Sequence, residues 1–250
     1  MLIPHLSSMV ATFKNPLFID IETVPVVENF EVLSLGMQAL WLKKAERLGM
    51  STLEEQQKAF FERAGIFSEF GKIVVIALGY ITTDKAQSSS LQVMGLAGHD
   101  EKSLLEDLKK ILMRLPGNTQ LCGHNGKEFD FPYLARRMTV NGIPLPHVLD
   151  MAGKKPWEVN HLDTMEMWKF GDRKNYTSLD LLAQLFEIPS SKDEMSGAEV
   201  GTYYYKDNDL AAIKRYCIKD VVTTAQVYRR LKFLPAIGVN HIKIIEKLGK

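Results

Sequence analysis

The feature that most constrains the fold is a short apolar run at residues 17–22 that carries two acids. Its β-branched and aromatic residues, and the proline that soon follows, predict a strand. Side chains alternate between the two faces of a strand, so Asp20 and Glu22 project from one face while Ile19 and Ile21 project from the other. The fold must therefore bury this strand and also accommodate two carboxylates on one of its faces.

Strand and helix patterns alternate along the rest of the chain. The run 72–80, a polar turn and the run 90–95 predict a hairpin, and 119–122 predicts another short strand. We expect an α/β fold with helices flanking a mixed β-sheet, and a helical insertion after the first strand. Apolar spacing predicts helices at 38–48, 100–115, 128–138, 179–186 and 209–233. Capping residues predict that two further helices begin at the capping box 51–54 and at residue 163.

The chain length of 250 residues suits one sizeable domain with its own core. The sequence contains no internal repeat and no linker rich in proline and serine. We therefore expect a single domain over residues 1–250, with its core at about 17–235 and the helical insertion at about 26–71.

Composition indicates an ordinary globular protein, with 46% apolar and 24% charged residues. A formal net charge of +1 argues against a protein that coats DNA tightly and without specificity. Cys122 and Cys217 form no CxxC pair, so a disulfide framework is not expected and a reducing compartment is. The first residues do not resemble a signal peptide, and no apolar stretch is long enough to span a membrane. We expect a cytoplasmic location.

Unless they are protonated, the paired acids Asp20 and Glu22 require a compensating cation, because two like charges on a mostly buried strand repel each other and lose solvation. A solvated edge strand is the alternative interpretation. A hard divalent cation such as Mg²⁺ or Mn²⁺, which takes oxygen ligands, is the compensation that fits best. Asp130 stands at the start of the predicted helix 128–138, directly after a strand end with Gly123 and Asn125. Its alternative interpretation is an acid that complements the helix dipole.

A further acid, Asp220, lies one helical turn after Tyr216. The pattern of tyrosine followed four residues later by aspartate occurs at several other places, but only this pair falls inside a long periodic helix. The two residues share a stripe with Ile213, Thr223 and Val227, which is expected to face the sheet. An acid on such a stripe is explained by a metal site.

These residues fall into three groups, in the order of the three exonuclease motifs of the DEDD superfamily. The sequence resembles the tyrosine variant of that superfamily, which serves in proofreading domains of DNA polymerases. It is similar to stand-alone bacterial proteins related to the proofreading exonuclease of family B polymerases, and the likeness covers about residues 17–235. The three groups are Asp20-Ile-Glu22-Thr23, the stretch from His124-Asn125 to Phe129-Asp130, and Tyr216 with Asp220.

The resemblance implies a ribonuclease H-like fold in which four acids bind two divalent metal ions, Mg²⁺ or Mn²⁺. It implies that Asp20 bridges both ions, that Glu22 and Asp220 complete the site that activates water, and that Asp130 holds the second ion. Tyr216 is implied to orient the attacking water. The reaction expected from such a site is two-metal hydrolysis of phosphodiester bonds.

Other residues are candidates for contact with the substrate. Thr23 and Asn125 are expected near the terminal nucleotide, although Asn125 also suits a strand end where it satisfies backbone groups. Phe131 and its neighbour Tyr133 are candidates for base stacking, and core packing is the alternative. Three basic residues suit either phosphate contacts or a solvated loop, and they are Lys169, Arg173 and Lys174.

The function expected from the resemblance is a 3′–5′ exonuclease that acts on single-stranded DNA with a free 3′ end and releases nucleoside 5′-monophosphates. The alternatives are an exoribonuclease that trims RNA and a domain that binds nucleic acid without catalysis. An endonuclease is disfavoured by the helix that carries Tyr216 and Asp220. The chain has no room for a polymerase domain, so a polymerase or repair partner is expected to act in trans.

Overall fold

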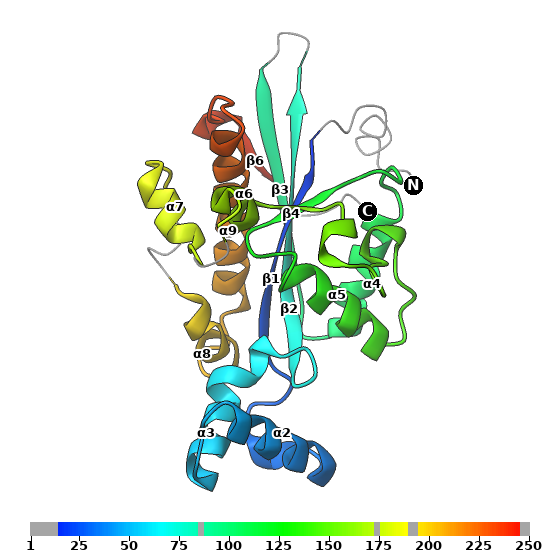
Figure 1. The fold of residues 1–250 in the computed structure, drawn as a ribbon, viewed down its shortest axis with the longest axis vertical. Coiled ribbons are helices and arrows are strands. Elements are labelled where there is room, and N and C mark those ends of the chain that lie inside the picture. The colour runs from blue at the N-terminus through cyan, green and yellow to red at the C-terminus, as the bar shows by residue number, and fades with distance from the viewer. Residues whose placement is uncertain (1–14, 85–87, 173–175, 190–194, 246–250) are drawn as a thin grey trace.

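One six-stranded sheet forms the centre of the protein, with strands in the order β5-β4-β1-β2-β3-β6 (Figure 1). The structure is a computed structural model and describes residues 15–84, 88–172, 176–189 and 195–245. The strands are β1 (Leu17–Pro25), β2 (Gly71–Thr83), β3 (Ser89–Ala97), β4 (Leu121–Gly123), β5 (Leu162–Asp163) and β6 (Ile242–Ile245).

The sheet is mixed, as the sequence predicts. The pairs β1–β2 and β2–β3 are antiparallel, which confirms the predicted hairpin. The pairs β1–β4, β4–β5 and β3–β6 are parallel. The short edge strand β6 follows the last predicted helix and was not predicted. Its four residues are too few for a sequence pattern to distinguish them from a loop.

Helices cover both faces of the sheet (Figure 1). On one side lie α4 (Glu101–Leu112) and α5 (Asp130–Val140), whose apolar residues pack with Ile19 and Ile21 of β1. On the other side lies α9 (Leu210–Leu231), which packs with Phe18 and Val24. Because side chains alternate along β1, Asp20 and Glu22 face the side that α9 covers. The register with β2 shifts between Glu22 and Thr23, where Val74 is an extra residue in β2, so the alternation along β1 continues to Val24.

The predicted helical insertion lies between β1 and β2. It consists of η1 (Phe30–Val32), α2 (Leu35–Arg47), α3 (Leu53–Arg63) and η2 (Ala64–Ile66). The insertion has its own apolar cluster around Trp41, whose ring makes edge contacts with Phe60 and Phe70. The capping box that opens α3 is one residue later than predicted, because Thr52 is the N-cap and Glu55 closes the box.

Side-chain caps explain where several of the later helices begin. Asp163 caps α6 (Thr164–Lys169), Ser178 caps α7 (Leu179–Leu185) and Asp209 caps α9. Residues 200–205 form the helix α8 (Val200–Tyr205), where the sequence analysis predicts no helix. The helix is held by tertiary contacts, since Tyr205 donates a hydrogen bond to the carbonyl of Pro25. The remaining 3₁₀ turns are η3 (His147–Leu149), η4 (Pro156–Glu158), η5 (Gly197–Glu199) and η6 (Val239–His241).

Candidate active site

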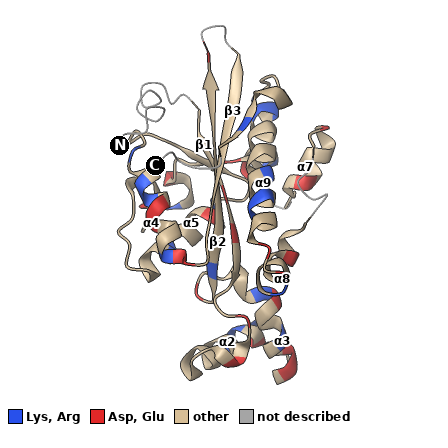
Figure 2. Cartoon of the chain, turned by 180° about the vertical axis from the view of Figure 1, so that it is seen from behind, with Lys and Arg blue, Asp and Glu red and all other residues tan. Residues whose placement is uncertain are grey.

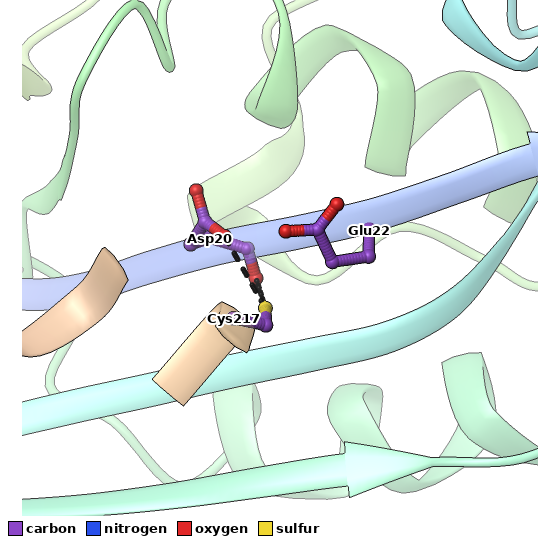
Figure 3. Close-up of side chains that lie close together, drawn as sticks. All are labelled: Asp20, Glu22 and Cys217. Atoms are coloured by element: carbon purple, nitrogen blue, oxygen red, sulfur yellow. Dashed lines mark hydrogen bonds between the residues drawn. The ribbon is translucent and has the colours of Figure 1, made fainter. Parts of the chain in front are cut away.

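The two acids of β1 lie beside the first half of α9. Asp20 is partly exposed, and Glu22 is only 8% exposed. One ligand atom each of Asp20, Glu22 and Cys217 lies within 4.8 Å of the other two (Figure 3). The Cys217 thiol donates to Oδ2 of Asp20 at 3.2 Å and lies 3.4 Å from the carbonyl oxygen of the same residue. Helix α9 is thus joined directly to the acidic stretch of β1.

Asp130 reaches the same stretch from the opposite layer. Its Oδ1 accepts a hydrogen bond from the backbone N–H of Ile21 at 3.1 Å, between the two acids of β1. The tight loop before α5 makes this approach possible. A Cβ on Gly126 would lie 2.9 Å from the Phe131 ring, so a side chain there would push the helix away. Asp130 is 4% exposed, and this contact orients its carboxylate.

The fourth acid, Asp220, stands one turn after Tyr216 on α9. The Tyr216 hydroxyl donates a hydrogen bond to the Asp220 carboxylate, and the tyrosine is 7% exposed. The negative charge of Asp220 contributes to raising the pKa of Asp20, Glu22 and Asp130. The structure therefore brings together all four acids that the sequence singles out, from β1, α5 and α9.

The cluster is electrostatically strained in the absence of a cation. Burial, followed by the charges of neighbouring carboxylates, raises the pKa of both Asp20 and Glu22 well above the ordinary range. Burial also raises the pKa of Asp130 to about 7, with smaller contributions from Asp163 and Asp220. The donor atoms are carboxylate oxygens crowded into one place, which is the ligand set that Mg²⁺ and Mn²⁺ prefer. The residues present thus fit a site for divalent cations.

The hydroxyl and the thiol beside the acids stay protonated at neutral pH. Burial and the charges of Asp220, Glu22 and Asp20 raise the pKa of Tyr216. Burial, then the charges of Asp20 and Glu22, raises the pKa of Cys217 well above its ordinary value. Both side chains therefore act as hydrogen-bond donors to the carboxylates.

Comparison with known families identifies this arrangement. Residues 67–238 match the model of a family described as a predicted 3′–5′ exonuclease related to the exonuclease domain of PolB. The chain belongs to this family. The matched region contains Asp130, Tyr216 and Asp220, whereas β1 with Asp20 and Glu22 precedes it.

Members of the PolB-related exonuclease family are expected to share the fold of the polymerase domain, and a solved structure agrees. The chain is similar to the family B DNA polymerase from the hyperthermophilic archaeon Pyrobaculum calidifontis, with a TM-score of 0.53 and 17% identity. The similarity covers 87% of this chain and 24% of the polymerase chain, so this protein spans about a quarter of its neighbour. The likeness shows an α/β, ribonuclease H-like fold. A search of curated proteins found no match.

Two polar residues were expected near the substrate, and they are Thr23 on β1 and Asn125 in the loop that leads to α5. Thr23 follows Glu22, is partly exposed and forms a side-chain hydrogen bond with Tyr133. Asn125 has a positive φ of 62°, a conformation that costs energy for any residue except glycine. Its Oδ1 is buried and has no hydrogen-bond partner among the described residues.

The base-stacking assignment of Phe131 is wrong. Its ring is fully buried in the core between the sheet and α5, and it contacts His161 edge to face at 5.2 Å. Tyr133 is 1% exposed, and its hydroxyl donates to the carbonyl of Gly65 in the insertion. Neither ring offers a free face to a base, because both lie on the side of α5 that packs against the sheet.

Of the predicted phosphate contacts, Arg173 and Lys174 lie outside the described residues.

Asp163 holds the active-site loop in place. Its carboxylate accepts hydrogen bonds from the backbone N–H groups of Asn125 and Lys127, at 2.9 and 3.0 Å, as well as capping α6. Next to Asn125, His124 donates from Nε2 to the carbonyl of Thr177 at 2.8 Å, and Nδ1 lies 2.9 Å from the Thr164 hydroxyl. The loop that leads to Asp130 is thereby tied to the starts of both α6 and α7.

Cys217 is the site residue that the sequence analysis missed. It follows Tyr216 and stands three residues before Asp220, a spacing that places side chains on one helix face. That spacing is the one feature of the sequence that indicates Cys217 as a site residue. The contact with Asp20 depends on how α9 crosses β1, and a cysteine in an apolar stripe is ordinarily a small core residue.

Proposed function

We propose that the protein is a metal-dependent exonuclease that removes nucleotides from the 3′ end of single-stranded DNA and releases nucleoside 5′-monophosphates. One observation carries the proposal, which is that Asp20, Glu22 and Asp130 converge on one place where burial and nearby carboxylates, Asp220 among them, raise the pKa of all three. Membership of the PolB-related exonuclease family supports the direction of attack from the 3′ end.

The four carboxylates would hold two divalent metal ions, Mg²⁺ or Mn²⁺. Asp20 is proposed to contribute to both ions, Glu22 and Asp220 to one, and Asp130 to the other. Bound in this way, the ions supply an activated water and stabilise the leaving oxygen. The backbone N–H of Ile21 donates to Oδ1 of Asp130 and holds this carboxylate beside Asp20 and Glu22.

Tyr216 is proposed to orient the attacking water. The hydroxyl is protonated, and Asp220 fixes its direction. Thr23 and Asn125 are proposed to contact the terminal nucleotide.

The charges on α9 suit a nucleic-acid substrate. The helix carries Lys214, Arg215 and Lys219 around the active-site turn, and a single acid, Asp220 (Figure 2). Lysine and arginine neutralise phosphate groups without reading sequence. Arg215 and Lys219 are the proposed phosphate contacts on this helix, because the Lys214 side chain lies over Gly95 of β3. A polymerase or repair protein that acts in trans is a proposed partner, because a proofreading role needs a separate polymerase.

An end-labelled oligonucleotide assay tests the proposal. Single-stranded DNA with a 5′ label should shorten to a ladder in Mg²⁺ or Mn²⁺, and EDTA should stop the reaction. Asp20→Ala should be inactive, whereas substitution of the exposed pair member Asp107 on α4 should have no effect. The same assay on RNA tests the exoribonuclease alternative. Full hydrolysis in metal-free buffer, or binding without any hydrolysis, would contradict the proposed function.

A further inference from the structure

Asp163 is a buried carboxylate to which the proposed two-metal site assigns no role. It is the last residue of β5, pairs in register with Gly123 of β4 and is 3% exposed. In the part of the chain that the structure describes, no cationic side chain lies within ion-pair distance of Asp163, and the ammonium of Lys127 pairs with Glu166 at 2.8 Å. A buried carboxylate without a cation requires hydrogen bonds, because burial removes its hydration.

Backbone N–H groups from two segments supply these hydrogen bonds. Oδ1 accepts from Asn125 at 2.9 Å and, as the cap of α6, from Met165 at 2.9 Å and Glu166 at 3.3 Å. Oδ2 accepts from the N–H of Lys127 at 3.0 Å. A helix cap requires a single side-chain acceptor, so the cap explains only one oxygen of Asp163. The other oxygen serves the active-site loop, residues 124–129.

The active-site loop has a conformation that needs an external hold. Asn125 has a φ of 62°, and a non-glycine residue stays in this left-handed region only where its surroundings determine it. Two N–H groups later in the loop donate to its carbonyl, at 3.2 and 3.0 Å, while Asp163 accepts from its own N–H. Asp130 comes directly after the loop, so a loop released by Asp163 would carry the Asp130 carboxylate away from β1.

The charge of Asp163 also reaches Asp130 through space. Burial is the main cause of the raised pKa of Asp130, and the charge of Asp163 contributes more to it than the charge of Asp220 does. A negative charge that opposes the ionisation of a carboxylate also attracts a cation to the same place. Asp163 therefore acts on Asp130 in two ways, through the loop and through its charge.

We propose that Asp163 is a positioning residue of the metal site, which holds the active-site loop and thereby sets the affinity for the cation that Asp130 binds. It touches neither the ions nor the substrate. The inference rests on the proposed function and deepens it, since a fifth carboxylate joins the site in a role other than metal ligand. Residues that orient metal ligands contribute roughly 10–100-fold to metal affinity or activity.

Substitutions at position 163 separate this role from capping. Aspartate, asparagine and serine are about equally good N-caps, so a residue that only caps α6 should tolerate both changes. Asp163→Asn keeps one oxygen for the cap and for Asn125 but lacks an acceptor for the N–H of Lys127. Asp163→Ser keeps the cap alone. Measured by calorimetry without nucleic acid, the affinity for Mn²⁺ should fall roughly tenfold in Asp163→Ser and by a smaller factor in Asp163→Asn.

Hydrogen exchange of the metal-free protein, followed by NMR, shows the hold on the loop directly. The amides of Asn125 and Lys127 should both lose protection in Asp163→Ser, and only that of Lys127 in Asp163→Asn. Asp100→Ser is the matched control, because Asp100 caps α4 through the N–H of Lys102 and, among the described residues, accepts hydrogen bonds only from that helix. The control should keep the exchange rates of the loop, the Mn²⁺ affinity and the turnover of the wild type.

The exonuclease assay adds a signature that a cap alone would not give. Excess Mn²⁺ should restore much of the activity that Asp163→Ser loses at low Mn²⁺, because a saturating concentration compensates for weaker binding. Equal Mn²⁺ affinity in the wild type, Asp163→Asn and Asp163→Ser would overturn the inference and reduce Asp163 to a cap.

If Asp163→Ser does not fold, Asp163→Asn decides alone, since asparagine preserves the cap. Wild-type Mn²⁺ affinity in Asp163→Asn, with wild-type protection of the Lys127 amide, would then overturn the positioning role. A wild-type protein that binds Mn²⁺ but hydrolyses no oligonucleotide would overturn only the proposed function, because the affinity and exchange measurements do not depend on hydrolysis.

Discussion

Tyr216 combines burial with one polar contact, the hydrogen bond that it donates to Asp220. If its hydroxyl orients the attacking water, Tyr216→Phe should lower kcat by roughly 10²-fold or more and leave the affinity for Mn²⁺ unchanged. Single-turnover kinetics and calorimetry measure the two quantities. Tyr228→Phe is the matched control, because Tyr228 lies on the same helix and packs against Phe18. Wild-type turnover in Tyr216→Phe would reduce the tyrosine to a packing role.

Cys217 has a testable effect on the charge state of Asp20. Its thiol hydrogen bond favours the ionised carboxylate and so opposes the rise in the pKa of Asp20. Removal of the donor in Cys217→Ala should raise that pKa further, so the acid limb of the pH–rate profile should move to higher pH. Cys217→Ser should stay close to wild type, and Cys122→Ala, at a buried cysteine of β4, is the control. An unmoved acid limb in Cys217→Ala contradicts the role.

At the scale of the elements, a buried ion pair fixes α5, which carries Asp130. Arg137 donates from Nε to Oε1 of Glu101 on α4 at 2.9 Å, and from Nη2 to Oε2 at 2.6 Å. Its Nη1 donates to the carbonyl of Ser68 near the end of the insertion, and Glu101 accepts from the N–H of Ile73 on β2. One pair therefore joins both helices, the sheet and the insertion.

Loss of one partner should be costly, because the other charge remains buried. Arg137→Ala should lower the free energy of unfolding by about 3–5 kcal/mol. Urea denaturation measures this change, and the double variant Arg137→Met/Glu101→Leu should lose much less. Lys110→Ala, which removes an exposed pair with Asp107, should change the stability far less than Arg137→Ala. Equal losses in the buried and the exposed pair would show that Arg137 does not fix α5.

At the scale of the whole molecule, the acidic cluster links stability to pH and to metal. The pKa of Asp130 is raised to about 7, so between its unfolded value and about 7 the folded protein binds more protons than the unfolded chain. The contribution of this group to stability is therefore present at low pH and is lost as pH rises through about 7. Bound cations favour the ionised form and should reverse the loss.

Thermal unfolding in EDTA and in Mn²⁺ tests this linkage. Mn²⁺ should raise Tm more at pH 8 than at pH 5. In EDTA, Asp130→Asn should gain stability relative to wild type as pH rises, because asparagine keeps an acceptor for Ile21 and carries no charge. A Tm difference between the two proteins that is independent of pH would contradict the linkage.

Among the helices that the structure describes, none has both the length and the apolar character to cross a membrane.

Residue spacing within single helices and strands predicts much of this structure from the sequence. Alternation along β1 determined that Asp20 and Glu22 share a face, and the helical turn determined that Tyr216 and Asp220 do. The hairpin, the insertion and the starts of α6, α7 and α9 followed from apolar spacing and capping residues. Each of these features depends on residues a few positions apart, so a single sequence contains the required information.

The tertiary structure alone decided which of these faces meet. The contact of Asp130 with the N–H of Ile21 spans 109 residues, and that of Cys217 with Asp20 spans 197. Phe131 is in the core, and residues 200–205 form a helix, because neighbouring elements cover them. Periodicity assigns a residue to a face, whereas the partner of that face is selected by packing between elements distant in the chain, on which local spacing carries no information.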